Sequence, residues 1–264
     1  MPAPLNTFKA ALAAGRPQIG LWLGLANSIT ADLCANAGFD WLLIDGEHAP
    51  NDIPTILAQA QAIGNRSHAI VRPPVGEAHL IKQVLDLGVQ TILVPMIESA
   101  EQAAAMARAM LYPPHGVRGV GAALARASNF GTTPAYLATA NAQTCLLLQI
   151  ESRAGLSALE AIAATEGVDG VFIGPADLAA DMGHLGNPAA SEVQVAVEGA
   201  LKRIMAQGKA AGILTSDRLL AQRYLDLGAS FVAVGSDVGL LSGAAAELRG
   251  AFACAAYGSK PTGY

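Results

Sequence analysis

The residues that could do chemistry follow apolar stretches of the sequence. The run "FDWLLI" leads into "DGEH", which holds Asp45 and His48; "AIV" ends at Arg72; and "LLLQI" and "FIGPA" lead to Glu151 and Asp177. Uninterrupted apolar runs of this length are typical of strands buried on both faces. In parallel sheets, ligands bind beyond the carboxyl ends of the strands. We therefore expect these side chains to share one site.

Glu151 and Asp177 are the candidate metal ligands. They follow consecutive predicted strands, and neighbouring strands lie about 4.8 Å apart, so both carboxylates can converge on one ion. Carboxylate ligands, with no cysteine nearby and no HxxxH spacing, suit Mg²⁺ or Mn²⁺ sooner than Zn²⁺, and Co²⁺ is a further candidate. The alternative is that Asp177 caps the next helix while Glu151 pairs with Arg153.

The segment "GPAD" closes one strand and opens a helix. The first N–H groups of a helix bind anions, so a substrate carboxylate would lie beside Gly174, Pro175 and Ala176. If the neighbouring oxygen reached the ion, the substrate would be a 2-oxo acid. Gln149, two residues before Glu151, is expected to face the same substrate. The alternative is a tight strand-to-helix turn that requires the glycine and the proline.

His48 is the candidate general base, because imidazole exchanges protons near neutral pH. Its orienting partner would be Asp45 or an aspartate from elsewhere in the chain. Arg72 faces the same region, and its fixed fork of donors suits a developing enolate or oxyanion. The alternatives are a structural histidine, and an ion pair of Arg72 with Glu47 or Glu98.

The lysines argue against imine chemistry. A barrel aldolase that works through a Schiff base needs a lysine near its pocket. The lysines of this chain are expected on helices, in a tail or at the start of a strand: Lys9, Lys82, Lys202, Lys209 and Lys260. A metal ion must therefore supply the electrophile.

Glycines divide the chain into repeated units of a helix end, a strand and polar residues, as in "LCANAGFDWLLIDGE" and "YLDLGASFVAVGSD". Helical periodicity separates the apolar runs. The expected strands span 18–24, 40–46, 68–73, 89–97, 144–151, 168–174, 209–215 and 229–235. Eight alternating units predict an α/β chain folded as a (β/α)₈ TIM barrel, a single domain over 1–264, with a short leading helix near 6–14. A doubly wound sheet is disfavoured because the first turn lacks GxGxxG.

Composition narrows the partners. The chain has 264 residues, 52% of them hydrophobic, and a net charge of −5 with no run of Lys or Arg, which disfavours nucleic acid and acidic membranes. We see no export signal or membrane span, and the cysteines Cys34, Cys145 and Cys254 are widely spaced, so we expect reduced, buried thiols in a cytoplasmic protein. Small molecules or other proteins are the expected partners.

Several segments, in order along nearly the whole chain, carry a family resemblance: "WLLIDGEHAPND", "VRPP", "LDLGVQTILVPMIESAEQA", "LLLQIES" and "GVFIGPADLA". They resemble the metal-dependent 4-hydroxy-2-oxoheptanedioate and 2-dehydro-3-deoxyglucarate aldolases, the class II pyruvate aldolases. The resemblance implies that a 4-hydroxy-2-oxo acid is cleaved reversibly to pyruvate, or a related 2-oxo acid, and an aldehyde, with the enolate held on the divalent ion.

The resemblance also assigns residues. It implies that Glu151 and Asp177 bind the ion, that pyruvate chelates it with its keto oxygen toward Arg72, and that His48 transfers protons in a dyad with an aspartate. Asp86, in "LDLG", corresponds to an acidic residue that a neighbouring subunit contributes in some members. From the residues alone, Asp86 would lie at a helix end on the wrong face of its own barrel.

The assembly and the specificity follow in the same way. The resemblance implies a homohexamer in which a C-terminal helix, residues 238–252, packs on a neighbouring subunit. The loops 112–134 and 180–192 exceed what a barrel needs and are expected to be functional or to contact a neighbour. Leu214 lies where specificity for the aldehyde would vary. The rival interpretations are a metal-dependent lyase of the citrate-lyase and malyl-CoA type, acting on a thioester, and a non-catalytic ligand-binding barrel.

Overall fold

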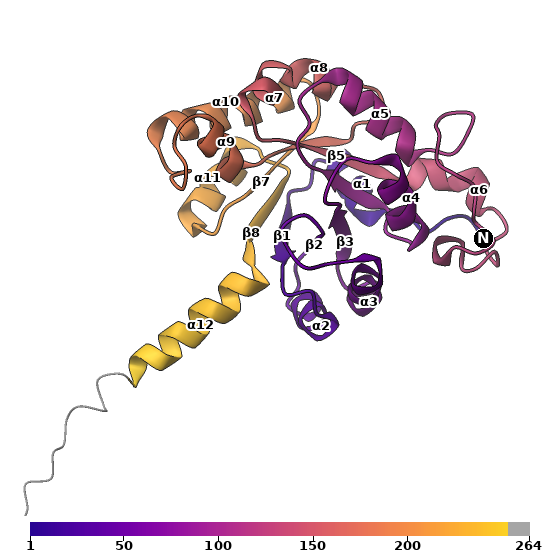
Figure 1. Ribbon diagram of the computed structural model, residues 1–264, viewed down its shortest axis with the longest axis horizontal. Helices are drawn as coiled ribbons and strands as arrows, with labels where there is room; N and C mark the ends of the chain where they lie inside the picture. Colours follow the sequence, from indigo (N-terminus) through magenta and orange to yellow (C-terminus); the bar gives the residue numbers. More distant parts are fainter. Residues whose placement is uncertain (253–264) are drawn as a thin grey trace, which may run out of the picture.

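The computed structural model describes residues 1–252 and shows a closed barrel (Figure 1). Its parallel strands pair in chain order, and the last pairs with the first. They are β1 (Gln18–Leu23), β2 (Trp41–Asp45), β3 (His68–Arg72), β4 (Thr91–Val94), β5 (Cys145–Ile150), β6 (Gly170–Ile173), β7 (Ala210–Leu214) and β8 (Phe231–Ser236). The predicted (β/α)₈ fold is confirmed. Cys254 and Lys260 lie outside the described residues.

Helices surround this barrel (Figure 1). They are α1 (Thr7–Ala13), α2 (Ser28–Asn36), α3 (Ile53–Ile63), α4 (Ala78–Asp86), α5 (Ala100–Met110), α6 (Tyr136–Thr139), α7 (Arg153–Ser157), α8 (Leu159–Ala164), α9 (Pro175–Asp181), α10 (Ser191–Ala206), α11 (Arg218–Leu227) and α12 (Asp237–Ala251). As the glycine pattern predicts, α11 ends at a glycine. Gly228 caps this helix in the left-handed region, with φ at 108°.

The fourth strand is shorter than the sequence predicts. The apolar run 89–97 suggested a strand to residue 97, but β4 ends at Val94. Pro95 has no N–H to donate to a neighbouring strand. Met96 has a φ of 56°, a left-handed conformation that no strand continues. The strand therefore ends at the barrel mouth three residues earlier than expected, and the turn that follows directs the N–H of Met96.

Aromatic side chains fill the inside of the barrel. Phe8, from α1, stacks on His68 and meets the edges of Trp41 and Phe231. Trp22 lies above them, against Trp41 and Phe172, at the end where the strands finish. Because α1 closes the opposite end, the interior is a packed core and the open end is the place for a site.

Helix α12 leaves the barrel wall. Helix α12 extends away from it (Figure 1), tied by the buried Asp237, whose carboxylate accepts hydrogen bonds from the N–H groups of Gly24 and Leu25 at 2.7 and 3.1 Å. Leu241 and Leu248 on α12 are exposed.

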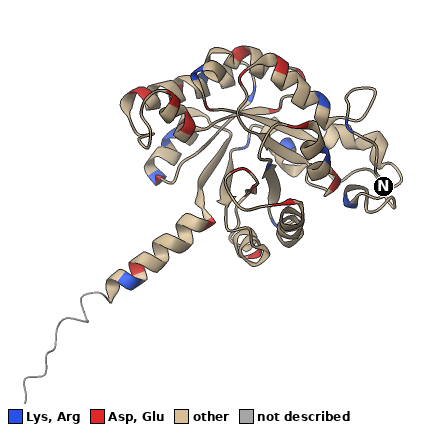
Figure 2. Cartoon of the chain, viewed as in Figure 1, with Lys and Arg blue, Asp and Glu red and all other residues tan. Residues whose placement is uncertain are grey.

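Figure 2 shows acidic and basic residues interspersed along the outer helices. Among the described residues, no helix is both long and apolar enough to cross a bilayer.

Candidate active site

The ends of β2 and β3 bring the first site residues together. Asp45 and Arg72 pair in register as the last residues of these strands. The next residue, Gly46, donates its N–H to the carbonyl oxygen of Arg72 at 2.7 Å, and a Cβ there would lie 2.8 Å from that oxygen. Only glycine allows this close approach. It explains why a glycine stands between the strand and the polar residues that follow.

Arg72 is held on several sides. Its Nε and Nη2 donate to the two carboxylate oxygens of Asp45 at 2.9 and 2.7 Å, and its guanidinium lies 5.2 Å from the ring centre of Trp22. The indole N–H of Trp22 reaches the same carboxylate at 3.3 Å. Burial alone would raise the pKa of Asp45, but hydrogen bonds and charge from Arg72, with the N–H groups of Glu47 and His48, lower it below its usual range. The pair is therefore ionised and rigid.

A hydrogen-bonded path leads from Arg72 to Glu151. Arg72 Nη1 donates to Gln149 Oε1 at 3.4 Å, and Gln149 Nε2 donates to Glu151 Oε2. Nη1 also lies 2.8 Å from Glu47 Oε2, at ion-pair distance without the geometry of a hydrogen bond. Both ends of the Gln149 amide are thus used within the protein. Its predicted contact with substrate stays a prediction, and its observed contacts orient Arg72 and Glu151.

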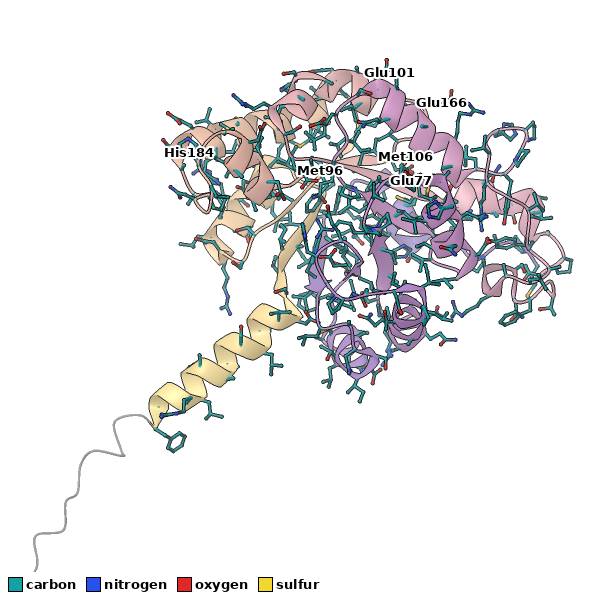
Figure 3. All side chains as sticks on the ribbon, viewed as in Figure 1. Glu77, Met96, Glu101, Met106, Glu166 and His184 are labelled. Atoms are coloured by element: carbon teal, nitrogen blue, oxygen red, sulfur yellow. The ribbon has the colours of Figure 1, made fainter. Side chains whose placement is uncertain are left out.

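Glu151 lies in a tight cradle. Its Oε1 accepts the N–H of Met96 at 2.9 Å, which is the bond that the left-handed turn after β4 makes. A Cβ at Gly174 would stand 2.5 Å from Glu151 Oε2. Burial raises the pKa of Glu151, and the charges of Glu47 and Asp177 add to the rise, while the bonds from Gln149 and Met96 oppose it. Met96 lies beside the barrel strands in Figure 3.

These residues fit a divalent cation. Burial is the main cause that raises the pKa values of Glu47 and Glu151, and the charge of Asp177 adds to both rises, while Arg72 lowers the pKa of Glu47. Carboxylate oxygens are what Mg²⁺ and Mn²⁺ prefer. Within residues 1–252, no three His, Cys, Asp or Glu side chains are arranged as a complete ligand set. Glu151 and Asp177 therefore stay the predicted ligands of such an ion.

The alternatives for the two carboxylates find no support. No side chain caps α9, so Asp177, in its first turn and exposed, is not a cap. Arg153 pairs with Asp181 at 3.4 Å instead of with Glu151. Of the two ion pairs suggested for Arg72, the pair with Glu47 is present. Glu98 instead accepts a hydrogen bond from the hydroxyl group of Ser152 at 2.6 Å.

His48 stands on the loop after β2 with 65% of its side chain exposed. Its Nε2 lies 3.8 Å from Glu47 Oε2, and its backbone N–H reaches Asp45 Oδ1 at 3.4 Å. The Asp45 oxygens accept hydrogen bonds from Arg72, Trp22 and the backbone N–H groups of Glu47 and His48, so the suggestion that Asp45 orients the imidazole stays a prediction. The carboxylate beside the imidazole ring is that of Glu47, which the sequence segment "DGEH" already contains.

Asp86 and Leu214 lie apart from this group. Asp86 ends α4 and accepts from Arg118 Nη2 at 2.7 Å; Arg118 is buried and stacked 4.3 Å from the ring centre of Tyr112. The structure therefore does not bring Asp86 to the Arg72 site of its own barrel. Leu214, half-buried at the end of β7, packs against the aromatic cluster inside the barrel.

Two residues of the site, Trp22 and Met96, were not predicted from the sequence. Trp22 lies within an apolar run and carries no signal apart from its size and its indole N–H. Met96 acts through its backbone, which its residue type does not reveal.

Lys9, Lys209 and His184 lie elsewhere. Lys9 and Lys209 donate to the carbonyl oxygens of Thr144 and Val168, just before β5 and β6, at the closed end of the barrel. His184 pairs with Glu192 at 2.7 Å on the loop after α9, well away from Met96 (Figure 3).

The chain is similar to known aldolases. Residues 18–244 match the family model described as HpcH/HpaI aldolase/citrate lyase. The chain is 61% identical to a hydroxypyruvate/pyruvate aldolase of Deinococcus radiodurans, covering 96% of this chain and 94% of that protein. It is 57% identical to a 4-hydroxy-2-oxo-heptane-1,7-dioate aldolase of Escherichia coli, covering 98% and 99%.

A solved structure gives the same result for the fold. The crystal structure of an HpcH/HpaI aldolase/citrate lyase family protein from Burkholderia cenocepacia has 40% sequence identity and a TM-score of 0.89, over 92% of this chain and 98% of that one. The family model spans most of the chain, and the two named aldolases match this chain over almost their full lengths. The chain belongs to the HpcH/HpaI aldolase/citrate lyase family and is a carbon–carbon lyase.

Proposed function

We propose that this protein reversibly cleaves a 4-hydroxy-2-oxo acid to pyruvate, or a related 2-oxo acid, and an aldehyde, with a divalent ion as cofactor. The observation that carries the proposal is the continuous path from Asp45 through Arg72 and Gln149 to Glu151 at the barrel mouth. The path links the fixed guanidinium group of Arg72, through Gln149, to the buried carboxylate of Glu151. The names of the relatives, which are aldolases acting on pyruvate, hydroxypyruvate or a 4-hydroxy-2-oxo diacid, support the substrate class.

Glu151 and Asp177 would hold the ion, Mg²⁺, Mn²⁺ or Co²⁺. When bound, such an ion polarises the keto oxygen and so supplies the electron sink for carbon–carbon cleavage. Gln149 and the N–H of Met96 fix the Glu151 carboxylate, as partners outside the ligand set commonly do. Gly174 leaves room for that carboxylate.

Arg72 stabilises the negative charge that develops on the keto oxygen during cleavage. Its plane is fixed by Asp45 and Trp22 before substrate arrives, so little reorganisation is needed. The first turn of α9 has no side-chain cap, which leaves the N–H groups of Ala176 and Asp177 for the substrate carboxylate. Gly174 and Pro175 set the turn that presents them, and Leu214 lines the side where the aldehyde portion would extend.

His48 removes the proton from the C4 hydroxyl group of the substrate. The C3–C4 bond then breaks, the aldehyde departs, and the electron pair remains on the 2-oxo acid as its enolate. The enolate takes up one proton at C3, and the protonated imidazole of His48 loses one, so the enzyme is restored. The exposed imidazole can reach a substrate that enters from solvent, and Glu47, beside it, carries the opposite charge when the ring is protonated.

We further propose a cytoplasmic homohexamer in which 1–264 forms one barrel domain. The exposed leucines of α12 support its packing on a neighbouring subunit, because isolated apolar helix faces bind other surfaces. Asp86, remote from its own barrel's Arg72, would then act at the site of a neighbour. Arg118 holds it in place for that contact.

Pyruvate release tests the function. A 4-hydroxy-2-oxo acid is supplied, pyruvate is detected through lactate dehydrogenase, and the rate is measured before EDTA, after EDTA, and with Mg²⁺, Mn²⁺ or Co²⁺ restored. The proposal predicts release that EDTA abolishes and an ion restores. No release with any ion would contradict it and favour a thioester lyase.

A further inference from the structure

The loop between β2 and α3, residues 46–52, is tied to its own beginning by one side chain. Asn51 donates its Nδ2–H to the carbonyl oxygen of Asp45 at 2.7 Å, and its backbone N–H donates to the carbonyl oxygen of Ala49 at 2.7 Å. The other end is fixed where Gly46 bonds to the strand β3. Glu47 and His48 lie between these two anchors.

A buried amide on α3 holds Asn51. Gln59 is 1% exposed and lies on the helix face that otherwise presents Ile56 and Ile63 to the core. Its Nε2 donates to Asn51 Oδ1 at 2.6 Å and to the carbonyl oxygen of Thr55 at 3.1 Å. Burying an amide costs free energy unless its groups are bonded. A leucine would fill similar space without that cost. The amide of Gln59 therefore serves to hold Asn51 in place.

The direction of the bonds makes the pair specific. Asn51 must direct Nδ2 at Asp45 and Oδ1 at Gln59, because a flipped amide would set donor against donor and oxygen against oxygen. Gln59 therefore selects the amide orientation that closes the loop.

His48 has little else to place it. Within residues 1–252 its ring makes no hydrogen bond, and the carboxylate beside it is 3.8 Å away. Its backbone N–H bond, at 3.4 Å, is long. The position of the imidazole thus follows from the backbone of the loop.

We infer that Gln59 and Asn51 are positioning residues for His48. The amide pair holds the loop so that the imidazole stands where it can take the C4 hydroxyl proton. This inference rests on the proposed function, because it extends the role given there to His48. Neither residue reaches the substrate, and Gln59 acts from the far side of the loop.

A double-mutant cycle tests the inference. Pyruvate release is measured for the wild type, Gln59→Leu, His48→Ala and the double variant, and Mn²⁺ affinity is measured for each. Gln59→Leu should lower kcat about 10- to 100-fold, as displacement of a catalytic group does, with KM and the Kd of Mn²⁺ within about twofold. In the His48→Ala background it should have almost no further effect, because the group that it positions is absent.

The matched control is Gln61→Leu, the same chemical change on the same helix at an exposed position. It should leave every constant within about twofold. Asn51→Ala gives a second, independent variant, and it should show the same dependence on His48. If Gln59→Leu does not fold, the cycle with Asn51→Ala decides.

Two kinds of failure are distinguishable. If Gln59→Leu lowers kcat by the same factor with and without His48, or leaves kcat unchanged while His48→Ala is impaired, this inference alone is overturned. A wild type that releases no pyruvate, or a His48→Ala variant with the full rate, would overturn the proposed function and the inference together.

Discussion

Arg72 and Asp45 face each other across β2 and β3, joined by two hydrogen bonds of 2.9 and 2.7 Å. Both side chains are buried, with 7% and 5% exposure, so neither can turn away without leaving a charge unpaired. The pair is thus a fixed part of the barrel mouth. It presents one edge of the guanidinium, Nη1, to Gln149 and Glu47.

Replacing Arg72 with lysine tests this geometry. A lysine keeps the charge but cannot make the paired bonds or stack on Trp22. Arg72→Lys should therefore lower kcat/KM by about 100-fold, the scale found when one oxyanion donor is lost. Steady-state kinetics measures the change, and circular dichroism checks the fold. Arg66→Lys, at the partly exposed pair with Asp32, is the control; equal rates for both variants would refute the role.

Gly174 should matter through space alone. In Gly174→Ala the added Cβ would stand 2.5 Å from Glu151 Oε2, so the carboxylate must shift. We expect divalent-ion affinity to fall about tenfold or more, measured by calorimetry with Mn²⁺. Gly199→Ala, in α10 with open space around its Cβ, should leave affinity unchanged and stabilise the protein slightly. Unchanged affinity in Gly174→Ala would show that the cradle is unimportant.

Met96 tests the left-handed turn. A β-branched residue is strained at a φ of 56°, whereas glycine adopts that conformation readily. Met96→Val should lower the free energy of unfolding by about 1–3 kcal/mol and weaken ion binding, because the N–H that holds Glu151 moves. Met96→Gly should keep ion affinity. Urea unfolding and Mn²⁺ titration measure both, and equal ion affinities would disprove the link.

The sequence predicted the elements better than the contacts. Strand positions followed from apolar runs and glycines, because burial on both faces dictates composition. The end of β4 was missed because the apolar run was taken to continue through Pro95, and because the left-handed conformation of Met96 has no signature in its side chain. The contacts of Asp45 with Arg72 and Trp22 were not predicted either, because strand register and side-chain rotamers decide them. Arg118 and Asp86, 32 residues apart, meet only through the tertiary fold.

His68 should make stability depend on pH. Burial lowers its pKa from 6.5 to about 4, where it stacks on Phe8 and bonds to Thr91. The unfolded chain takes up a proton near pH 6.5 but the folded protein does not, so this contribution is complete above pH 6.5 and is lost as the pH falls toward 4. The loss amounts to at most about 3 kcal/mol.

Urea unfolding at pH 7 and pH 4.5 measures this dependence. His68→Gln should lose less free energy of unfolding than the wild type over that interval, because glutamine does not titrate. His184→Gln, at the partly exposed pair with Glu192, serves as the control. If His68→Gln and the wild type lose the same amount, another group carries the acid sensitivity.

We propose that Glu151 and Asp177 hold the ion on which turnover depends. The most direct measurement is Mn²⁺ titration and pyruvate release on the same preparations of wild type, Glu151→Gln and Asp177→Asn, with Glu98→Gln as the control. We predict one ion per chain in the wild type and the control, and at least about 100-fold weaker binding with loss of release in the two site variants. Site variants that bind Mn²⁺ as tightly as the wild type, or release pyruvate at its rate, would contradict the account.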